Sequence, residues 1–248
     1  MVLACGSCAY PHVTGTNAGY ELAKSLGHTL VPTLPVLSGL CIKERALTRL
    51  SGVKCQVRTT VKNVPQAQAE GELIFTNYGI NGPAALNISQ TVSRELKNGH
   101  VALEVNFFPQ LKDPHAFLEA RLEKFGSRKP KDFFAGILNE GIINLLIDFV
   151  GMRKNAPMNE QYAQRAFQTL QAWPVTVTAM RPWKEAMVAA GGVSTQEINP
   201  DTFESRLHPG LYLTGELLDV DGKSGGFNLH FAWASGFTAA HALVNKED

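Results

Sequence analysis

The chain has 248 residues, 44% of them hydrophobic and 18% charged, which supplies enough apolar material for a buried core and excludes wholesale disorder. Its 23 basic and 22 acidic residues leave a net charge of +1. That balance gives no broad electrostatic footprint for nucleic acid or an anionic membrane, although it leaves room for a local basic patch. No basic segment precedes an apolar run at the start, and polar residues interrupt the most apolar stretch, 137–150. We expect a cytoplasmic protein without a membrane segment.

The first third of the chain predicts a short strand, a turn and a helix. Residues 2–4 have the pattern of a strand end, and residues 18–26 have helical spacing, with Gly27 placed to end the helix. A short apolar segment, residues 29–31, comes before two prolines.

The middle of the chain has the period-two pattern of half-buried strands. Apolar and polar residues alternate over 53–62 and again over 101–107, and residues 72–75 are a further strand candidate. Between the last two we expect one helix that opens at Asn81-Gly82-Pro83 and ends at Gly99. These elements favour an antiparallel sheet or a small barrel.

Helices are predicted for residues 113–172. Asp113-Pro114 is a helix start, Asp132 begins a second helix, and a third runs over 159–172. From Trp173 the strand pattern returns, and the tail has the order strand, turn, glycine-rich loop and helix.

Four cysteines raise the question of a metal or redox site. Cys5 and Cys8 have the C-x-x-C spacing, but a zinc site needs a second tight pair, and Cys41 and Cys55 lie too far apart to supply one. We expect reduced, mostly buried thiols and no bound metal. A redox or metal protein built on Cys5 and Cys8 is kept as a third alternative.

The segment from Pro209 to Leu243 carries the strongest functional signal. Residues 211–213 suit a buried parallel strand, and Gly215-Glu216 follow at its carboxyl end, where ligands bind in open α/β sheets. Glu216 and Asp219 could accept hydrogen bonds from ligand hydroxyls there.

A glycine-rich loop, residues 221–226, then leads into a helix that begins near Phe227. Its glycines allow a close approach of the backbone to a ligand, and the first N–H groups of the helix suit an anion or an electron-rich carbonyl. The alternative is a tight turn with a packing helix, in which Asp219 and Asp221 are turn residues.

These residues resemble a known family. Residues 210–236, GLYLTGELLDVDGKSGGFNLHFAWASG, resemble the C-terminal flavin signature of the NAD(P)/FAD-dependent oxidoreductases related to BaiN and to bacterial aminoacetone oxidase. Residues 185–193 (EAMVAAGGV), 203–205 (FES), 71–83 (GELIFTNYGINGP) and 3–20 resemble further motifs of that family, in the same order along nearly the whole chain.

The resemblance implies an α/β protein in which a partial Rossmann-like FAD-binding domain is interrupted by a β-barrel-like domain that carries a helical insert. The FAD-binding domain would comprise residues 1–35 and 189–248. The barrel would comprise residues 36–112 with a return strand at 173–188, and the insert residues 113–172.

The resemblance also implies where FAD would bind. Gly215 and Glu216 would lie at its ribityl and pyrophosphate region, and the loop before the last helix would line the isoalloxazine ring. His230 could face the flavin, but such a histidine is more simply packed or solvated, so no catalytic residue is assigned. The predicted cofactor-binding residues are Ala4, Cys5, Gly6, Gly191, Gly192, Gly215, Glu216, Asp219, Gly225, Gly226, Phe227, Asn228 and Leu229.

This sequence departs from the family pattern in two ways. Cys5, Ser7, Ala9 and Ala189 stand where the family has Thr, Gly, Ser and Thr. The strand, G-x-G-x-x-G turn and helix with which the family begins are absent, so we expect a truncated gene product, a misassigned start or a fragment.

Two functions from different classes follow. The first is a flavoenzyme that passes hydride between NAD(P)H, FAD and a substrate or oxygen. Its substrate would be a small molecule, such as an amine or a steroid-like enone, or uridine in ribosomal RNA bound by Lys54, Arg58 and Lys62. The second is a non-catalytic fragment or interaction module that does not bind FAD. The oligomeric state stays open.

Overall fold

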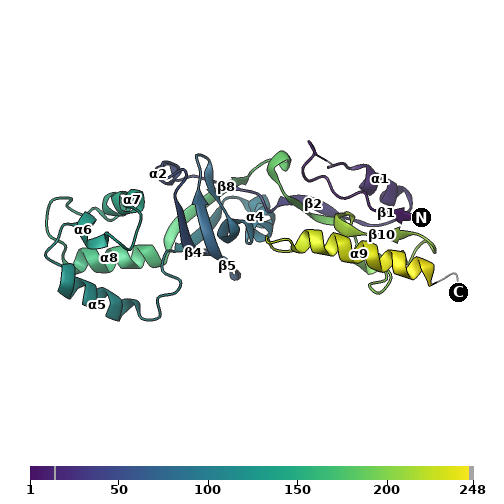
Figure 1. Ribbon diagram of the computed structural model, residues 1–248. Helices are drawn as coiled ribbons and strands as arrows, with labels where there is room; N and C mark the ends of the chain where they lie inside the picture. Colours follow the sequence, from purple (N-terminus) through teal and green to yellow (C-terminus); the bar gives the residue numbers. More distant parts are fainter. Residues whose placement is uncertain (14, 246–248) are drawn as a thin grey trace. The chain divides into compact units, whose positions relative to one another are not determined.

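The computed structural model describes residues 1–13 and 15–245, which form two compact units (Figure 1). Unit 1 comprises Met1–Gly39, Ser89–Lys97 and Met180–Asp248, and unit 2 comprises Leu40–Ile88 and Asn98–Ala179. The domain ranges inferred from the sequence remain predictions. The contact units differ from them in placing residues 36–39, 89–97 and 180–188 with unit 1.

Unit 1 contains two small sheets. Strand β1 (Val2–Leu3) pairs in parallel with β10 (Tyr212–Leu213), with Val2 opposite Tyr212. Strand β2 (Leu30–Val36) pairs antiparallel with β9 (Val188–Val193). The register of the second pair shifts between Val31 and Leu34, which accommodates Pro32.

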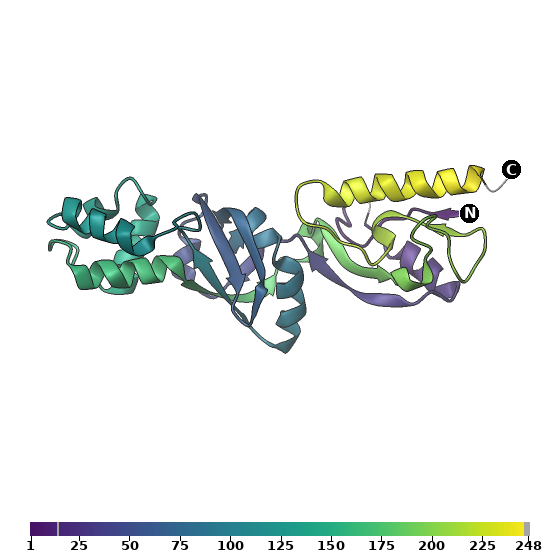
Figure 2. The same ribbon diagram turned by 90° about the horizontal axis from the view of Figure 1, so that it is seen from below.

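Helices and single-turn helices complete the described part of unit 1. They are α1 (Ala18–Ser25), α4 (Ser89–Glu95), α9 (Phe227–Val244), η2 (Trp183–Glu185), η3 (Thr195–Glu197) and η4 (Gly215–Leu217). Figures 1 and 2 both show α9 running alongside the β1–β10 pair. A buried cluster joins these elements, formed by Leu3, Tyr20, Ala23, Val193, Ile198, Leu211, Leu213, Leu217 and Leu218.

Unit 2 is built on a closed barrel in the order β3-β6-β5-β4-β7-β8. The strands are β3 (Leu40–Ile42), β4 (Lys54–Val61), β5 (Val64–Phe75), β6 (Gly79–Asn81), β7 (Val101–Asn106) and β8 (Trp173–Met180). The alternating apolar and polar residues of the sequence point alternately into the barrel and toward solvent. Val57, Thr59 and Val61 of β4 are buried, while Lys54 and Gln56 are exposed. The short helices α2 (Arg45–Thr48) and α3 (Pro83–Leu86) also belong to this unit, and the single turn η1 (Leu96–Asn98) follows α4.

The helical segment of unit 2 lies between β7 and β8. It contains α5 (Pro114–Phe125), α6 (Pro130–Phe134), α7 (Glu140–Val150) and α8 (Glu160–Gln171). Phe133, Phe134, Leu146 and Leu170 are fully buried among them. The Asp113 side chain caps α5 by accepting from the N–H of Ala116, and Asn159 caps α8 by accepting from the N–H of Tyr162.

Most of the expected elements are present, and the mixed α/β fold with its barrel is confirmed. Three details were wrong. The helix expected from residue 83 is broken into α3 and α4, because Ser89 turns inward and its Oγ accepts from the N–H of Leu37 at 2.8 Å. The second helix of the insert begins at Pro130 rather than Asp132, and α7 was not separated from its neighbours. No helix in the described ranges has the length and apolar character needed to span a membrane.

Candidate cofactor site

The carboxyl ends of β1 and β10 lie side by side because the two strands are parallel and in register. Each strand leads into a glycine with a left-handed backbone, Gly6 at φ +69° and Gly215 at φ +66°. Only glycine adopts this conformation readily, so the segments after β1 and β10 both turn sharply at the same edge of the sheet. This is the edge at which open α/β sheets bind ligands, so the predicted residues of the two ends are brought together here.

Glu216 ties three segments of unit 1 together. Its Oε1 accepts a hydrogen bond from the Ser7 hydroxyl at 2.6 Å and from the Ala189 N–H at 2.7 Å. Its carbonyl oxygen accepts from the Tyr20 hydroxyl at 3.4 Å. Burial raises the pKa of the Glu216 carboxyl, and the bonds from Ser7 and Ala189 partly oppose that rise. A half-buried carboxylate is thus held in one orientation at the end of β10.

Two further carboxylates follow along the same loop. Asp219 accepts from the Gly191 N–H at 3.1 Å, and Asp221 accepts from the side-chain amide of Gln90 at 2.7 Å. Burial raises the pKa of Asp221, while the Gln90 bond and the nearby Arg94 lower it. Asp219 and Asp221 therefore fasten the loop to β9 and α4.

Close packing requires glycine at positions 191 and 192. Their φ angles are +84° and +133°, and a side chain would collide with backbone. A Cβ on Gly191 would lie 2.4 Å from the Pro32 oxygen, and one on Gly192 would lie 2.7 Å from the Leu217 oxygen. The absence of a side chain at Gly191 and Gly192 therefore allows β9 to pack closely against β2 and η4.

The loop before α9 presents glycine backbone to open space. Gly225 and Gly226 have φ angles of +115° and +94°, and a Cβ on Gly226 would meet no heavy atom within 4 Å. The Asn228 side chain closes the loop: its Oδ1 accepts from the Gly222 N–H at 2.7 Å and its Nδ2 donates to the Gly222 oxygen at 3.0 Å. The first turn of α9 thus starts beside an uncrowded surface, with N–H groups that have no intrahelical acceptor.

The outer face of α9 is apolar and exposed. Phe227, Leu229, Trp233 and Phe237 are 63%, 74%, 81% and 69% exposed, and His230 is exposed as well. Only Ser235 and Ala239 of this helix are buried, and the Ser235 hydroxyl accepts from the Gly215 N–H at 2.9 Å. The helix therefore contacts η4 through a narrow stripe of small residues.

The cysteine pair has no third ligand nearby. Cys5 is exposed and the other three cysteines are only partly buried, so the expectation of mostly buried thiols was wrong. Gly19 of α1 comes so close to Cys5 that an added Cβ would lie 2.6 Å from Cys5 Cβ. Burial raises the pKa of the Cys8 thiol, so it is a poor thiolate. The described ranges hold no group of three or more metal-ligating side chains.

Two buried residues, Ser205 and His28, form a hydrogen-bonded chain with the partly exposed Glu197 of η3. His28 Nε2 lies 3.0 Å from Ser205 Oγ, and His28 Nδ1 lies 3.0 Å from Glu197 Oε2. The order matches a catalytic triad, but Ser205 Oγ also accepts from the N–H groups of Leu207 and His208. Ser205 and His28 are buried, and Ser205 Oγ already accepts two backbone hydrogen bonds. The three side chains therefore have a structural role: they connect the loop at Ser205 to η3 through His28.

Several partners of this site were not predicted from the sequence. Ser7, Tyr20, Gln90 and Ala189 orient the acidic groups, yet only Tyr20 and Ala189 lie in the segments 3–20 and 185–193 in a way that gave any signal. Ser7 was noted only as a departure from a glycine.

Comparison with known proteins identifies the family of the chain. The family profile described as "HI0933-like protein Rossmann domain" matches residues 1–242. In an alignment of 254 positions that covers 99% of the chain, it is 34% identical to the 3-dehydro-bile acid delta(4,6)-reductase of Clostridium scindens, and it covers 62% of that protein. It is 30% and 29% identical to the ribosomal RNA dihydrouridine synthases of Haemophilus influenzae and Escherichia coli, over 99% and 98% of the chain and 60% of each relative. The chain thus spans less than two thirds of the length of these relatives, and it belongs to the HI0933-like Rossmann-domain family.

Proposed function

We propose that this chain functions as an FAD-dependent oxidoreductase and that unit 1 binds the flavin nucleotide. The observation that supports this most strongly is the paired carboxyl ends of β1 and β10, each followed by a left-handed glycine, with Glu216 held between them. Membership of a Rossmann-domain family and a relative named as a reductase support a redox role.

The residues present fit parts of FAD in chemical character. Glu216 Oε1 is taken by Ser7 and Ala189, so Oε2 is the oxygen that would accept a hydrogen bond from a ribityl or ribose hydroxyl. Gly225 and Gly226 leave room for a flat ring to approach the backbone. The N–H groups at the start of α9 would donate to a flavin carbonyl, with the positive end of the helix dipole behind them.

The division of labour follows from the cofactor. A bound flavin supplies hydride acceptance and donation, and the protein supplies binding, orientation and the exclusion of competing reactions. In this chain Glu216 orients the sugar side, and the loop from Gly222 to Asn228, closed by its own side-chain bonds, orients the ring side.

The test is anaerobic reduction of the chain after it has been loaded with FAD and freed of unbound cofactor. NADH or NADPH should bleach the visible flavin band, and a Glu216→Ala chain should retain less flavin in the same procedure. A wild-type chain that retains no flavin would overturn the proposal. A chain that binds FAD but is not reduced by either nucleotide would restrict it to oxidase chemistry with another electron donor.

For the substrate we favour a small molecule over RNA. The three barrel cations that could contact RNA are each paired with a glutamate on a neighbouring strand: Lys54 with Glu72 at 3.5 Å, Arg58 with Glu70, and Lys62 with Glu104 at 3.7 Å. Such pairing reduces the net positive charge that phosphate binding requires. A conjugated 3-oxo bile acid should therefore accelerate oxidation of the reduced chain, and a ribosomal RNA fragment should not. The opposite result would favour the activity named for the two synthases.

A further inference from the structure

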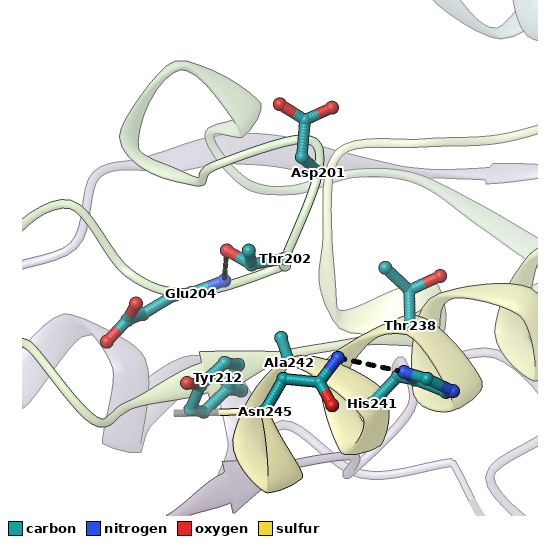
Figure 3. A pocket seen from close by; sticks show the side chains of 8 residues that line it. All are labelled: Asp201, Thr202, Glu204, Tyr212, Thr238, His241, Ala242 and Asn245. Atoms are coloured by element: carbon teal, nitrogen blue, oxygen red, sulfur yellow. Dashed lines mark hydrogen bonds between the residues drawn. The ribbon is translucent and has the colours of Figure 1, made fainter. Parts of the chain in front are cut away.

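A cavity of unit 1, separate from the candidate cofactor site, lies between the loop after η3 and the C-terminal turns of α9 (Figure 3). Its volume is about 360 Å³. Asp201, Thr202 and Glu204 line it from the loop, and His241 and Asn245 line it from the helix. None of these residues belongs to the set that the family resemblance assigns to the flavin.

Tyr212 of β10 lines the same cavity and has an unpaired hydroxyl. The residue is fully buried, and its hydroxyl is the one buried side-chain polar atom, within residues 1–13 and 15–245, that has no hydrogen-bond partner. A buried hydroxyl without a partner costs free energy, so an unpaired one beside a cavity indicates a ligand group that would complete it.

The polar groups of the adjacent loop form hydrogen bonds with one another, and none of these bonds involves the Tyr212 hydroxyl. The Glu204 N–H donates to Thr202 Oγ1 at 3.2 Å, as Figure 3 shows, and Glu204 Oε1 accepts from the Gly210 N–H at 2.7 Å. The Asp201 N–H donates to Asn199 Oδ1 at 3.0 Å. These bonds set the shape of the loop wall without using the tyrosine.

The charges around the cavity are negative. Asp201 and Glu204 contribute two carboxylates, and neither lysine nor arginine is among the described residues that line it. His241 and Asn245 lie at the C-terminal end of α9, where the helix dipole places partial negative charge. The cavity therefore attracts a cation and disfavours carboxylates and phosphates.

Size and donor chemistry select the kind of cation. The described part of the chain has no group of three metal-ligating side chains here, and the volume exceeds that of a single ion. A primary ammonium group carries three N–H donors, which carboxylate and hydroxyl oxygens accept. We propose that this cavity binds a small organic ammonium ion, with the Tyr212 hydroxyl as an acceptor and Asp201 and Glu204 as the source of the attraction.

The first test titrates the full chain with butylammonium at low ionic strength and follows binding by nuclear magnetic resonance. Butanol and butyrate serve as neutral and anionic probes of similar shape. We expect butylammonium to bind at least tenfold more tightly than either, and added salt to weaken its binding. Equal binding of butanol, or no binding of butylammonium, would overturn the proposal.

Two variants tie the binding to this cavity. Tyr212→Phe removes the hydroxyl alone, so butylammonium affinity should fall about tenfold while the ligand-free chain is no less stable than the wild type. Asp201→Asn should also weaken binding and is at an exposed position that tolerates the change. Tyr162→Phe on α8, outside the cavity, is the matched control and should bind normally. A destabilised Tyr212→Phe chain, or unchanged affinity in both cavity variants, would contradict the assignment.

Discussion

Gly226 is the position at which flavin contact and backbone strain can be separated by a single pair of variants. Gly226 has φ +94° and Gly27 has φ +82°, and a Cβ at either would meet no heavy atom within 4 Å. Valine in this left-handed conformation costs about 1–2 kcal/mol at both positions. For a chain of this length, each kcal/mol lowers Tm by about 2–4 °C, so both variants should lose about 2–8 °C.

Flavin binding should distinguish the two variants. The Gly226→Val side chain would enter the space where we place the flavin ring, whereas Gly27→Val lies at the end of α1, outside the candidate site. We expect FAD affinity to fall at least tenfold in Gly226→Val, which corresponds to about 1.4 kcal/mol, and to stay unchanged in Gly27→Val. Quenching of flavin fluorescence measures the affinity and circular dichroism measures Tm. Equal FAD affinities in the two variants would refute the placement of the ring.

Three further predictions concern unit 1. Because burial raises the folded-state pKa of Glu216 above the ordinary 4.5, its stabilisation is complete below 4.5 and is lost as pH rises from there through the folded value; Glu216→Gln should flatten the fall of Tm across that window, and an unchanged slope would contradict this. Gly191→Ala should cost more stability than Gly210→Ala in urea unfolding, since both have left-handed φ but only the first Cβ meets backbone, at 2.4 Å; equal losses would rule out the close approach. Trp233→Lys should change stability by less than about 0.5 kcal/mol and reduce self-association in sedimentation, whereas a large loss of Tm would show that this face is packed.

Local chemistry explains which elements could be predicted from the sequence. Asp113 and Asn159 are helix caps, and Gly27 ends α1 at positive φ, so each boundary is set by residues next to it in the chain. The alternation in β4 and β7 reports burial directly. The first half of β5 is different, because its alternating apolar positions after Val64 are alanines, which have a low strand propensity, and it forms a strand through pairing with β4.

The site was predictable in its glycines and acids but not in their partners. Ser7 and Glu216 are 209 residues apart, and Gln90 and Asp221 are 131 residues apart. Such pairs arise only when tertiary folding brings β1, α4 and β10 together. Flavin contact by the glycines at 191 and 192 stays a prediction, and the contacts that require glycine there, to Pro32 and Leu217, are backbone contacts with no sequence pattern.

The visible absorbance spectrum of the purified chain, with FAD added and unbound cofactor then removed, tests the central claim most directly. We predict a retained flavin band and quenching of the flavin fluorescence. Both the band and the quenching should be weaker in Gly226→Val and preserved in Gly27→Val. A colourless chain that leaves the spectrum and emission of added FAD unchanged would contradict flavin binding by unit 1 and would favour the interaction module instead.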